Sequence, residues 1–424
     1  MFNFRLLKTK NNILKLTSKM KNTKNKFNKQ NKNVTVGYTG RKLTNYSGLA
    51  GVSKYLKKNK IFKKFNTLFP TVLNNATQFS NSQILMLIIL SSFCKIKRFK
   101  NIETFSNDAL TQQILNLDKS ISDSRLSERL KEMGEKVSRK IEENLLHENK
   151  EFLSSIPESK ITVDIDSSVK SVYGNQEGAE KGYNDKKKGL KSYHPLLAFV
   201  SDYKLALHTW FRTGNAYTSN GIEEFVKQIL NNVPNNIKKI FFRMDSGFFN
   251  NQLIELVENA GHEYLIKVKF KGMYQIFKIL NYEQTENPNY SISEFDYPFT
   301  IENQEGEKIK ACRLLRVIRK IVSKSKGKFG EDVIEYEYFC FCSNLKGKTT
   351  EEIYDIYKKR ADCENWIEQI KNHLLAGSTL TDNFWANDIL WQLSVYAYNL
   401  SRKMRLNIKE FFKQEFNTFR DWFI

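Results

Sequence analysis

The middle of the chain alternates apolar and polar positions with the period of two that is typical of β-strands. In residues 160–169, Ile161, Val163 and Ile165 share one face. Asp164 and Asp166 share the other face. Further strand patterns follow at residues 194–200, 204–212, 240–244 and 264–270, with helical patterns at 221–230 and 251–259. Three meandering strands followed by alternating helix and strand predict an α/β domain with a mixed sheet.

Helical spacing precedes this domain, from about residue 52 to residue 153. Ser80 or Ser82 is the expected N-cap of a helix that starts at Gln83, and Asp123 or Ser124 of a later one. Short helices separated by polar turns, with Arg125 and Arg129 exposed on one of them, are typical of helix-turn-helix modules. Ordinary packing units give the same pattern, so both interpretations stay open.

The segments beyond the α/β pattern differ in texture. Strand-like runs at 311–322 and 332–343 predict a β-rich insertion, and helix is expected again at 349–375 and 388–413. The expected organisation is therefore a basic flexible arm (1–45), a helical region (46–157), the first part of the α/β domain (158–270), the β-rich insertion (271–347) and C-terminal helices that complete the α/β domain (348–424). A length of 424 residues suits about three structural units.

Charge is distributed very unevenly along the chain. The formal net charge is +22, from 68 basic and 46 acidic residues. Residues 1–100 hold 22 of the basic residues, and the first acidic residue is Glu103. An A/T-rich genome would raise the lysine content, but it would not remove Asp and Glu. A one-signed segment of this kind indicates a polyanionic partner, nucleic acid before an anionic membrane surface.

Cysteines and hydropathy exclude other classes. The five cysteines are scattered and form no pair of C-x2-C motifs, so reduced cysteines in a cytosolic protein are expected. The longest unbroken aliphatic run, residues 84–90, has seven residues, whereas a membrane helix needs about 20. The N-terminus lacks the apolar core of a signal peptide. We therefore expect a cytoplasmic protein.

Three carboxylates occupy positions where catalytic acids are common. Asp166 ends the first predicted strand, and Asp245 directly follows the apolar strand at 240–244. Carboxylates at strand ends converge where α/β sheets bind ligands, although such residues often only cap the next helix. Glu364 lies on the predicted helix 349–375, where Tyr357, Arg360, Glu364 and Lys371 fall within a sector of about 60°. An amphipathic helix with salt-bridged flanks would show the same stripe.

The spacing of that stripe resembles the Y-R-E-K signature of DDE transposases of cut-and-paste insertion sequences. Tyr357, Arg360, Glu364 and Lys371 match it without a gap. The same group is resembled by residues 164–169, 173–178, 181–184, 192–196, 212–215, 243–248 and 360–365. The resemblance implies a ribonuclease H-like fold in which a β-rich insertion separates the second Asp from the Glu. Residues 271–347 stand in that place.

The resemblance also implies the chemistry. Such enzymes cut phosphodiesters by water attack and join 3′-hydroxyls to target DNA with two Mg²⁺ ions, for which Mn²⁺ is an expected substitute. Mg²⁺ prefers carboxylate oxygens, which suits three acids without Cys or His. By position, the implied ligands are Asp166, Asp245 and Glu364. Asp164 remains a rival for the first place, because it shares the strand face of Asp166.

DNA contacts follow from the same resemblance. Tyr357, Arg360 and Lys371 are expected to contact phosphates near the cut, since Arg grips a phosphate bidentately and Lys acts as a point charge. A loop containing Lys186, Lys187, Lys188 and Lys191 is a further candidate backbone contact, with a solvated loop as the alternative. Arg125 and Arg129 are the candidates in the helical region.

The resulting hypothesis is a DNA transposase that binds terminal inverted repeats, cuts both element ends and inserts the element elsewhere. Double-stranded DNA is the expected partner, in a homodimer or higher oligomer, in the nucleoid of a prokaryote. The alternatives are a catalytically silent DNA-binding descendant and a nuclease without strand transfer. Some relatives stack a Trp of the insertion on a flipped base of a hairpin intermediate, but no Trp occurs between residues 211 and 365. The ending at Ile424 also leaves a shortened C-terminus open.

Overall fold

The computed structural model describes residues 44–71, 78–182, 184, 187–302, 308–326 and 332–424. The expected basic arm, 1–45, therefore lies almost entirely outside the described residues, as does Lys186. No helix in the described ranges is long and apolar enough to cross a membrane. All five cysteines are free, as expected, and Cys340, Cys342 and Cys363 are buried.

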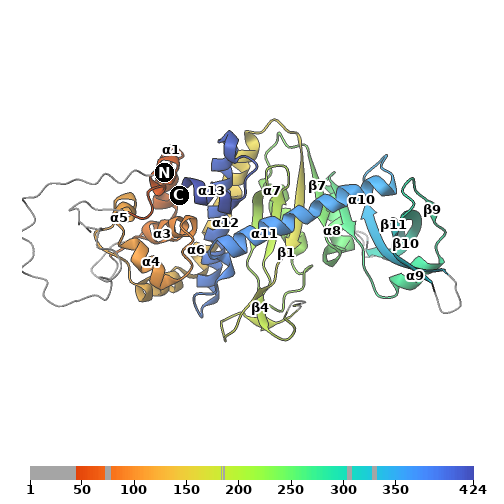
Figure 1. Cartoon of the computed structure of the whole chain (residues 1–424), viewed down its shortest axis with the longest axis horizontal. Helices are drawn as coiled ribbons and strands as arrows, with labels where there is room; N and C mark the ends of the chain where they lie inside the picture. Colours follow the sequence, from red (N-terminus) through yellow and green to blue (C-terminus); the bar gives the residue numbers. More distant parts are fainter. Residues whose placement is uncertain (1–43, 72–77, 183, 185–186, 303–307, 327–331) are drawn as a thin grey trace, which may run out of the picture. The chain divides into compact units, whose positions relative to one another are not determined.

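A mixed α/β fold is built around one large sheet (Figure 1). Among the described residues the sheet has nine strands in the order β6-β5-β1-β7-β8-β12-β11-β10-β9. The strands of the first part are β1 (Lys160–Ser167), β5 (Leu196–Val200), β6 (Leu205–Trp210), β7 (Lys239–Met244) and β8 (Glu263–Lys267). β1 pairs antiparallel with β5 and parallel with β7, and β7 pairs parallel with β8. The predicted mixed sheet is confirmed.

Helices cover both faces of the sheet around β5, which explains why every residue of β5 is buried. Leu197 and Phe199 pack into a core with the C-terminal helices α11 (Asp362–His373) and α12 (Phe384–Leu406). Leu196, Ala198 and Val200 point into the opposite core, formed with α7 (Ile222–Asn232) and α8 (Asn251–Asn259). Helix α11 contacts β1 and crosses in front of it in Figure 1.

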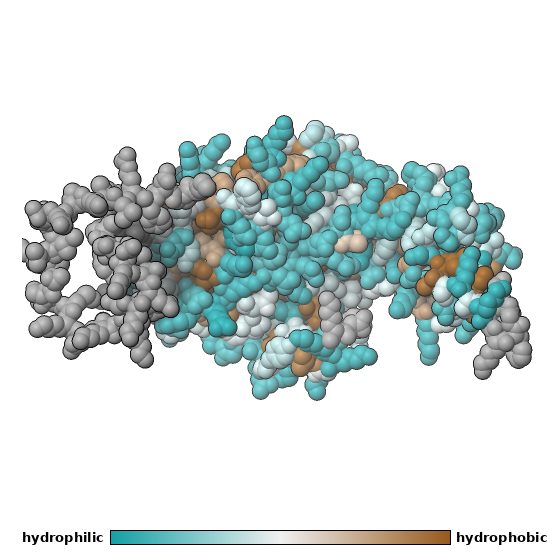
Figure 2. Space-filling model, viewed as in Figure 1, coloured by the Kyte–Doolittle hydropathy of each residue, from teal (hydrophilic) through white to brown (hydrophobic). Residues whose placement is uncertain are grey.

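The strands of residues 271–347 extend the same sheet. Their elements are α9 (Met273–Ile279), β9 (Glu283–Gln284), β10 (Tyr290–Glu302), β11 (Lys308–Lys326) and β12 (Asp332–Ser343). β12 pairs antiparallel with β8, so the sheet continues from one part into the other. Figure 2 shows a mostly hydrophilic surface with an apolar area over the β10–β11 end, and Ile279 and Val322 are 80% and 60% exposed. The short helix α9 was not anticipated from the sequence.

The helical region before the sheet contains six described helices. They are α1 (Leu49–Lys58), α2 (Ile61–Leu68), α3 (Asn81–Phe93), α4 (Phe99–Ser106), α5 (Ala109–Leu115) and α6 (Asp123–Ser154). Ser80 caps α3 in a reciprocal capping box with Gln83, as one of the two expected caps. The expected cap of α6 was wrong by one position, because Ser122 accepts the hydrogen bond from the Arg125 amide. Gly134, with a φ of 53°, kinks α6.

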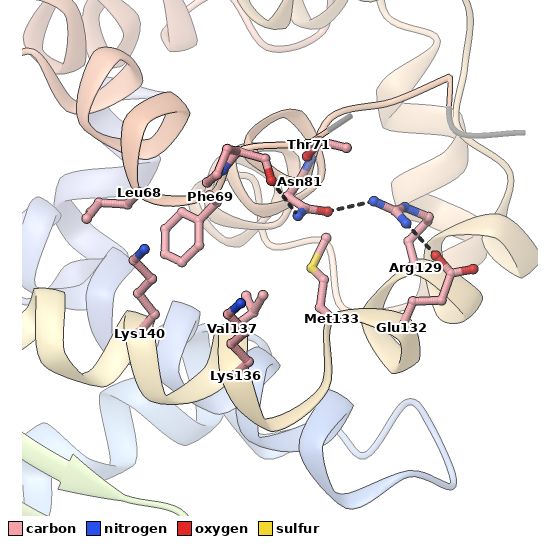
Figure 3. Close-up of a pocket in the computed structure, with 11 residues that line it drawn as sticks. Leu68, Phe69, Thr71, Asn81, Arg129, Glu132, Met133, Lys136, Val137 and Lys140 are labelled. Atoms are coloured by element: carbon pink, nitrogen blue, oxygen red, sulfur yellow. Dashed lines mark hydrogen bonds and ion pairs between the residues drawn. The ribbon is translucent and has the colours of Figure 1, made fainter. Parts of the chain in front are cut away.

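The expected exposure of Arg129 is also wrong. Arg129 is 8% exposed and donates to Asn81 Oδ1 at 2.6 Å, while it also bonds Glu132. Figure 3 shows this arrangement at the edge of a cavity of about 420 Å³ between α6 and the end of α2. Hydrogen bonds to α3 and within α6 hold the guanidinium inside the helical bundle. Arg125 is partly exposed and paired with Glu128 at 3.1 Å.

The C-terminal part contains α10 (Thr350–Lys358), α11, α12 and α13 (Phe416–Phe423). The single helix expected at 349–375 is interrupted by a 3-10 turn at Lys359–Ala361. The helix expected at 388–413 begins earlier, at Phe384, where Asn383 caps it, and ends at Leu406. Arg360, one of the four Y-R-E-K residues, lies in this 3-10 turn between α10 and α11.

Candidate active site

The two aspartates lie at the same edge of the sheet. Asp166 is the penultimate residue of β1, and Asp245 directly follows β7. Because β1 and β7 are parallel neighbours, their carboxyl ends lie side by side. Asp166, Asp245 and Glu364 all line one cavity of about 590 Å³, together with Arg360 and Lys371. The tertiary structure thus gathers residues that are almost 200 positions apart.

Asp166 is largely buried, with 14% of its side chain exposed. Its Oδ1 accepts a hydrogen bond from the Ser167 amide at 2.8 Å, and its Oδ2 lies 3.1 Å from Arg360 Nη1. Burial raises its pKa to about 6, although Arg360 and the Ser167 amide favour the charged form. The Arg360 contact is an ion pair without the alignment of a hydrogen bond. A cation that approaches this carboxylate would stabilise its charged form.

Asp164, the rival for the first position, is engaged elsewhere. It is fully buried, and its two oxygens accept hydrogen bonds from Arg243 Nε at 2.7 Å and Nη2 at 2.8 Å. Ser201 Oγ also donates to Asp164 at 2.9 Å. Arg243 in turn donates to the carbonyl of Ile356 at the end of α10. Asp164 therefore forms a bidentate ion pair that ties β1, β7 and α10 together, and it does not line the cavity.

Asp245 and Tyr357 connect the sheet to α10. Asp245 caps the 3-10 turn Ser246–Phe248 by accepting from the Ser246 amide at 2.6 Å. The Tyr357 hydroxyl donates to the same Oδ1 at 3.4 Å. Burial raises the pKa of Tyr357, so its hydroxyl keeps its proton. Asp245 therefore caps the turn and lines the cavity at the same time.

Arg360 and Glu364 occupy opposite extremes of exposure. The Arg360 side chain is 8% exposed, whereas that of Glu364 is 63% exposed. Arg360 Nη2 lies 3.3 Å from Glu364 Oε1, one turn later. Although burial opposes it, the carboxylates around Arg360 raise its pKa. The guanidinium therefore sits between Asp166 and Glu364 with its charge retained.

Lys371 and Lys187 are further basic residues of the cavity lining. Lys371 Nζ donates to Ser168 Oγ at 2.9 Å and to the Val169 carbonyl at 2.7 Å, which joins α11 to the segment after β1. Lys187 also lines the cavity, while Lys188 is exposed and outside its lining. Lys191 donates to Asn175 at 2.8 Å. Arg125 and Arg129 are not part of this cavity.

The three acids offer only carboxylate oxygens, which fits a hard divalent cation such as Mg²⁺. Within the described ranges, however, no three His, Cys, Asp or Glu side chains lie close enough together to hold a metal ion. Arg360 accounts for this spacing, because it stands between Asp166 and Glu364. The carboxylate oxygens are therefore suitable ligands for a metal ion. In this structure, however, Arg360 bridges two of the three acids, Asp166 and Glu364.

Two features of the site were not anticipated from the sequence. Lys170, on β2 (Lys170–Ser171), is buried and lines the cavity. His194 is buried beside Ser167, with 3.1 Å between His194 Nε2 and Ser167 Oγ. β2 pairs with β4 (Lys191–Tyr193), which also pairs with β3 (Glu180–Lys181) in a small second sheet. Lys170 belongs to a lysine-rich sequence, and nothing local marks it as buried.

Fold and site together define an α/β protein whose sheet edge gathers acidic and basic side chains around one cavity. The model of the family Transposase DDE domain group 1 matches residues 26–421. The chain therefore belongs to this family of transposases, and a DNA transposase is its general function. No protein with a curated description matches the chain.

Solved structures give a distant likeness. A piggyBac transposase synaptic complex with hairpin DNA matches at 13% identity, over 89% of this chain and 79% of that chain, with a TM-score of 0.47.

Proposed function

We propose that this transposase binds the terminal inverted repeats of its own insertion sequence, cleaves both ends and joins the 3′-hydroxyls to target DNA. One observation carries the proposal: the signature residues Arg360, Glu364 and Lys371 line the same cavity as Asp166 and Asp245. Tyr357, the remaining signature residue, bonds Asp245. The two aspartates and the four signature residues, which are far apart in the sequence, thus meet at one polar site on the edge of the sheet.

Asp166, Asp245 and Glu364 are the residues that would hold Mg²⁺. When bound, two such ions supply stabilisation of the attacking and leaving oxygens of a phosphodiester. Two basic residues of the chain, Arg360 and Lys371, would bind the phosphates. Arg360 has a planar guanidinium suited to a phosphate, and Lys371 places an ammonium at the far end of the cavity. Tyr357 holds the Asp245 carboxylate by its hydroxyl.

The strand order supports a ribonuclease H-like catalytic domain in residues 158–270 and 348–424. The first three strands, β6, β5 and β1, are antiparallel neighbours, and β7 and β8 follow in parallel. We assign residues 271–347 as the β-rich insertion and residues 46–157 as the helical DNA-binding region. The basic segment 1–45 is proposed to contact the DNA backbone, and a dimer or higher oligomer to bridge the two ends.

The test uses the purified full-length protein and linear DNA that carries the gene with its native flanks. Wild type, Glu364→Gln and the control Glu410→Gln are each incubated with and without Mg²⁺, and cut ends are mapped. Glu410 is an exposed acid outside the cavity. Metal-dependent cuts at the repeat boundaries, lost only in Glu364→Gln, are the expected result. Tight binding to the ends without any cut by wild type would contradict the proposal and favour a silent DNA-binding descendant.

A further inference from the structure

Lys170 is a buried cation at the edge of the cavity. It is 3% exposed, and its Nζ donates to the carbonyl of Ser378 at 2.8 Å. Its ammonium also lies 5.5 Å from the centroid of the Phe211 ring. Among the described residues, no carboxylate lies within ion-pair distance of Lys170. One carbonyl and one ring are weak compensation for removing a full charge from water.

The backbone around Lys170 is closely determined. Strand β2 pairs antiparallel with β4, with Lys170 opposite Tyr193. The Ser378 carbonyl follows a 3-10 turn at Leu375–Gly377, which packs tightly on the end of α11. A Cβ on Gly377 would lie 2.2 Å from the Lys371 carbonyl, so only glycine permits this approach. Two segments more than 200 residues apart therefore hold the ammonium in place.

Positive charge is concentrated at this end of the cavity. Burial lowers the pKa of Lys170, and the charge of the nearby Lys371 lowers it further, to about 7. Lys187 lines the same cavity, and Glu368 is the additional acid of the lining, on the exposed side of α11. An ammonium has three donors, and Lys170 uses one on Ser378. An anion with several acceptor oxygens would satisfy the others.

We propose that Lys170 is a phosphate-binding residue, which with Lys371 grips a backbone phosphate of the DNA strand next to the bond that is cut. The inference rests on the proposed function, which supplies DNA as the substrate. It adds a residue outside the Y-R-E-K signature to the site. A phosphate at this position compensates the buried charge, and the acids at the opposite end stay free to act on the neighbouring phosphodiester.

The first experiment measures anion binding without any cleavage. Inorganic phosphate is titrated at constant ionic strength, with sodium chloride as balance, and thermal unfolding is followed for wild type, Lys170→Met and Lys403→Met. Lys403 is a matched control, a largely buried lysine of α12 near the Glu148 carboxylate. Phosphate should raise the Tm of wild type and of Lys403→Met, and that rise should shrink at least threefold in Lys170→Met. An equal rise in all three proteins would overturn the proposal.

A second variant guards against loss of folding. Lys170→Gln keeps an N–H for the Ser378 carbonyl but removes the charge, so it should fold and lose the phosphate effect as Lys170→Met does. Retention of the full phosphate effect by Lys170→Gln would overturn the charge-based inference.

The final experiment uses DNA and separates the two hypotheses. With duplex carrying the element end, loss of one phosphate contact should reduce the slope of log K against log salt by about 1. Single-turnover cleavage should fall at least tenfold in Lys170→Met. Equal salt slope and cleavage in the variant would overturn the role of Lys170 while the transposase function stands. A wild type that never cuts, but binds phosphate through Lys170, would instead overturn the transposase proposal and leave the anion site in place.

Discussion

Arg360 Nη1 lies 3.1 Å from Asp166 Oδ2, and the same guanidinium reaches Glu364 Oε1 with its Nη2 at 3.3 Å. One side chain therefore links an acid at the end of β1 to an acid on α11. Arg360 lies in the 3-10 turn between α10 and α11, and its side chain is buried. The arginine thus bridges the two carboxylates.

Replacing Arg360 by lysine should therefore damage the site despite the retained charge. A lysine ammonium is a point charge on a flexible stem and cannot span both carboxylates as a planar guanidinium does. We expect Arg360→Lys to reduce end cleavage at least tenfold and to lower the free energy of unfolding by about 1–2 kcal/mol. Cleavage and urea unfolding of the same preparations provide the measurement. Wild-type cleavage by Arg360→Lys would show that the bridge has no part in the reaction.

The same substitution should affect stability at one aspartate of β1 and cleavage at the other. Asp164→Asn leaves the charge of Arg243 buried with a neutral partner, so a loss of about 3–5 kcal/mol of stability is expected. Asp166→Asn removes a carboxylate whose burial is already unfavourable, and the fold should be retained while cleavage is abolished. Thermal unfolding and end cleavage of both variants are compared. A folded, inactive Asp164→Asn beside an active Asp166→Asn would reverse the assignment of the first ligand.

Asp388 provides a pH-dependent stability test away from the cavity. Burial in α12 raises its pKa to about 7, and Gln392 Nε2 donates to it at 3.2 Å. The folded pKa lies above the unfolded value, so the folded state binds more protons between about pH 4 and pH 7. Its contribution to stability is therefore present at low pH and is lost as pH rises through about 7.

Asp388→Asn removes this titration and keeps an acceptor for Gln392. We expect the variant to be more stable than wild type by about 1–3 kcal/mol at pH 8, with a much smaller difference at pH 5. Urea unfolding at both pH values measures the difference. A gap between variant and wild type that is the same at the two pH values would mean that Asp388 does not titrate in this range.

The basic N-terminal segment should dominate the salt dependence of DNA binding. Residues 1–100 carry 22 basic residues and no acid. Removal of residues 1–43 should flatten the slope of log K against log salt by several units, since each phosphate contact contributes about 0.9. Binding isotherms from about 50 to 200 mM salt measure the slope for both proteins. An unchanged slope would exclude this segment from the DNA contact.

Local patterns in the sequence were sufficient to predict the elements of the first part of the sheet. The strands at β1, β5, β6, β7 and β8 were found within a few residues, because alternation of apolar side chains is a local property of a strand. The same holds for helix α8, whose bounds agree fully. The positions of Asp166 and Asp245 at strand ends follow from the same pattern. The spacing of Tyr357, Arg360, Glu364 and Lys371 is likewise contained in the sequence alone.

Burial and pairing were decided only by the tertiary structure, because both depend on segments that are far apart in the chain. Asp164 and Asp166 share a strand face, yet Arg243 of β7 occupies one and the cavity reaches the other. Arg129 was expected at the surface, but Asn81 of α3 draws it into the bundle. Lys170 is polar in sequence and buried in the fold, since β4 and the turn at Ser378 close over it. The sequence determines which side chains are available, and long-range packing determines which of them lose contact with water.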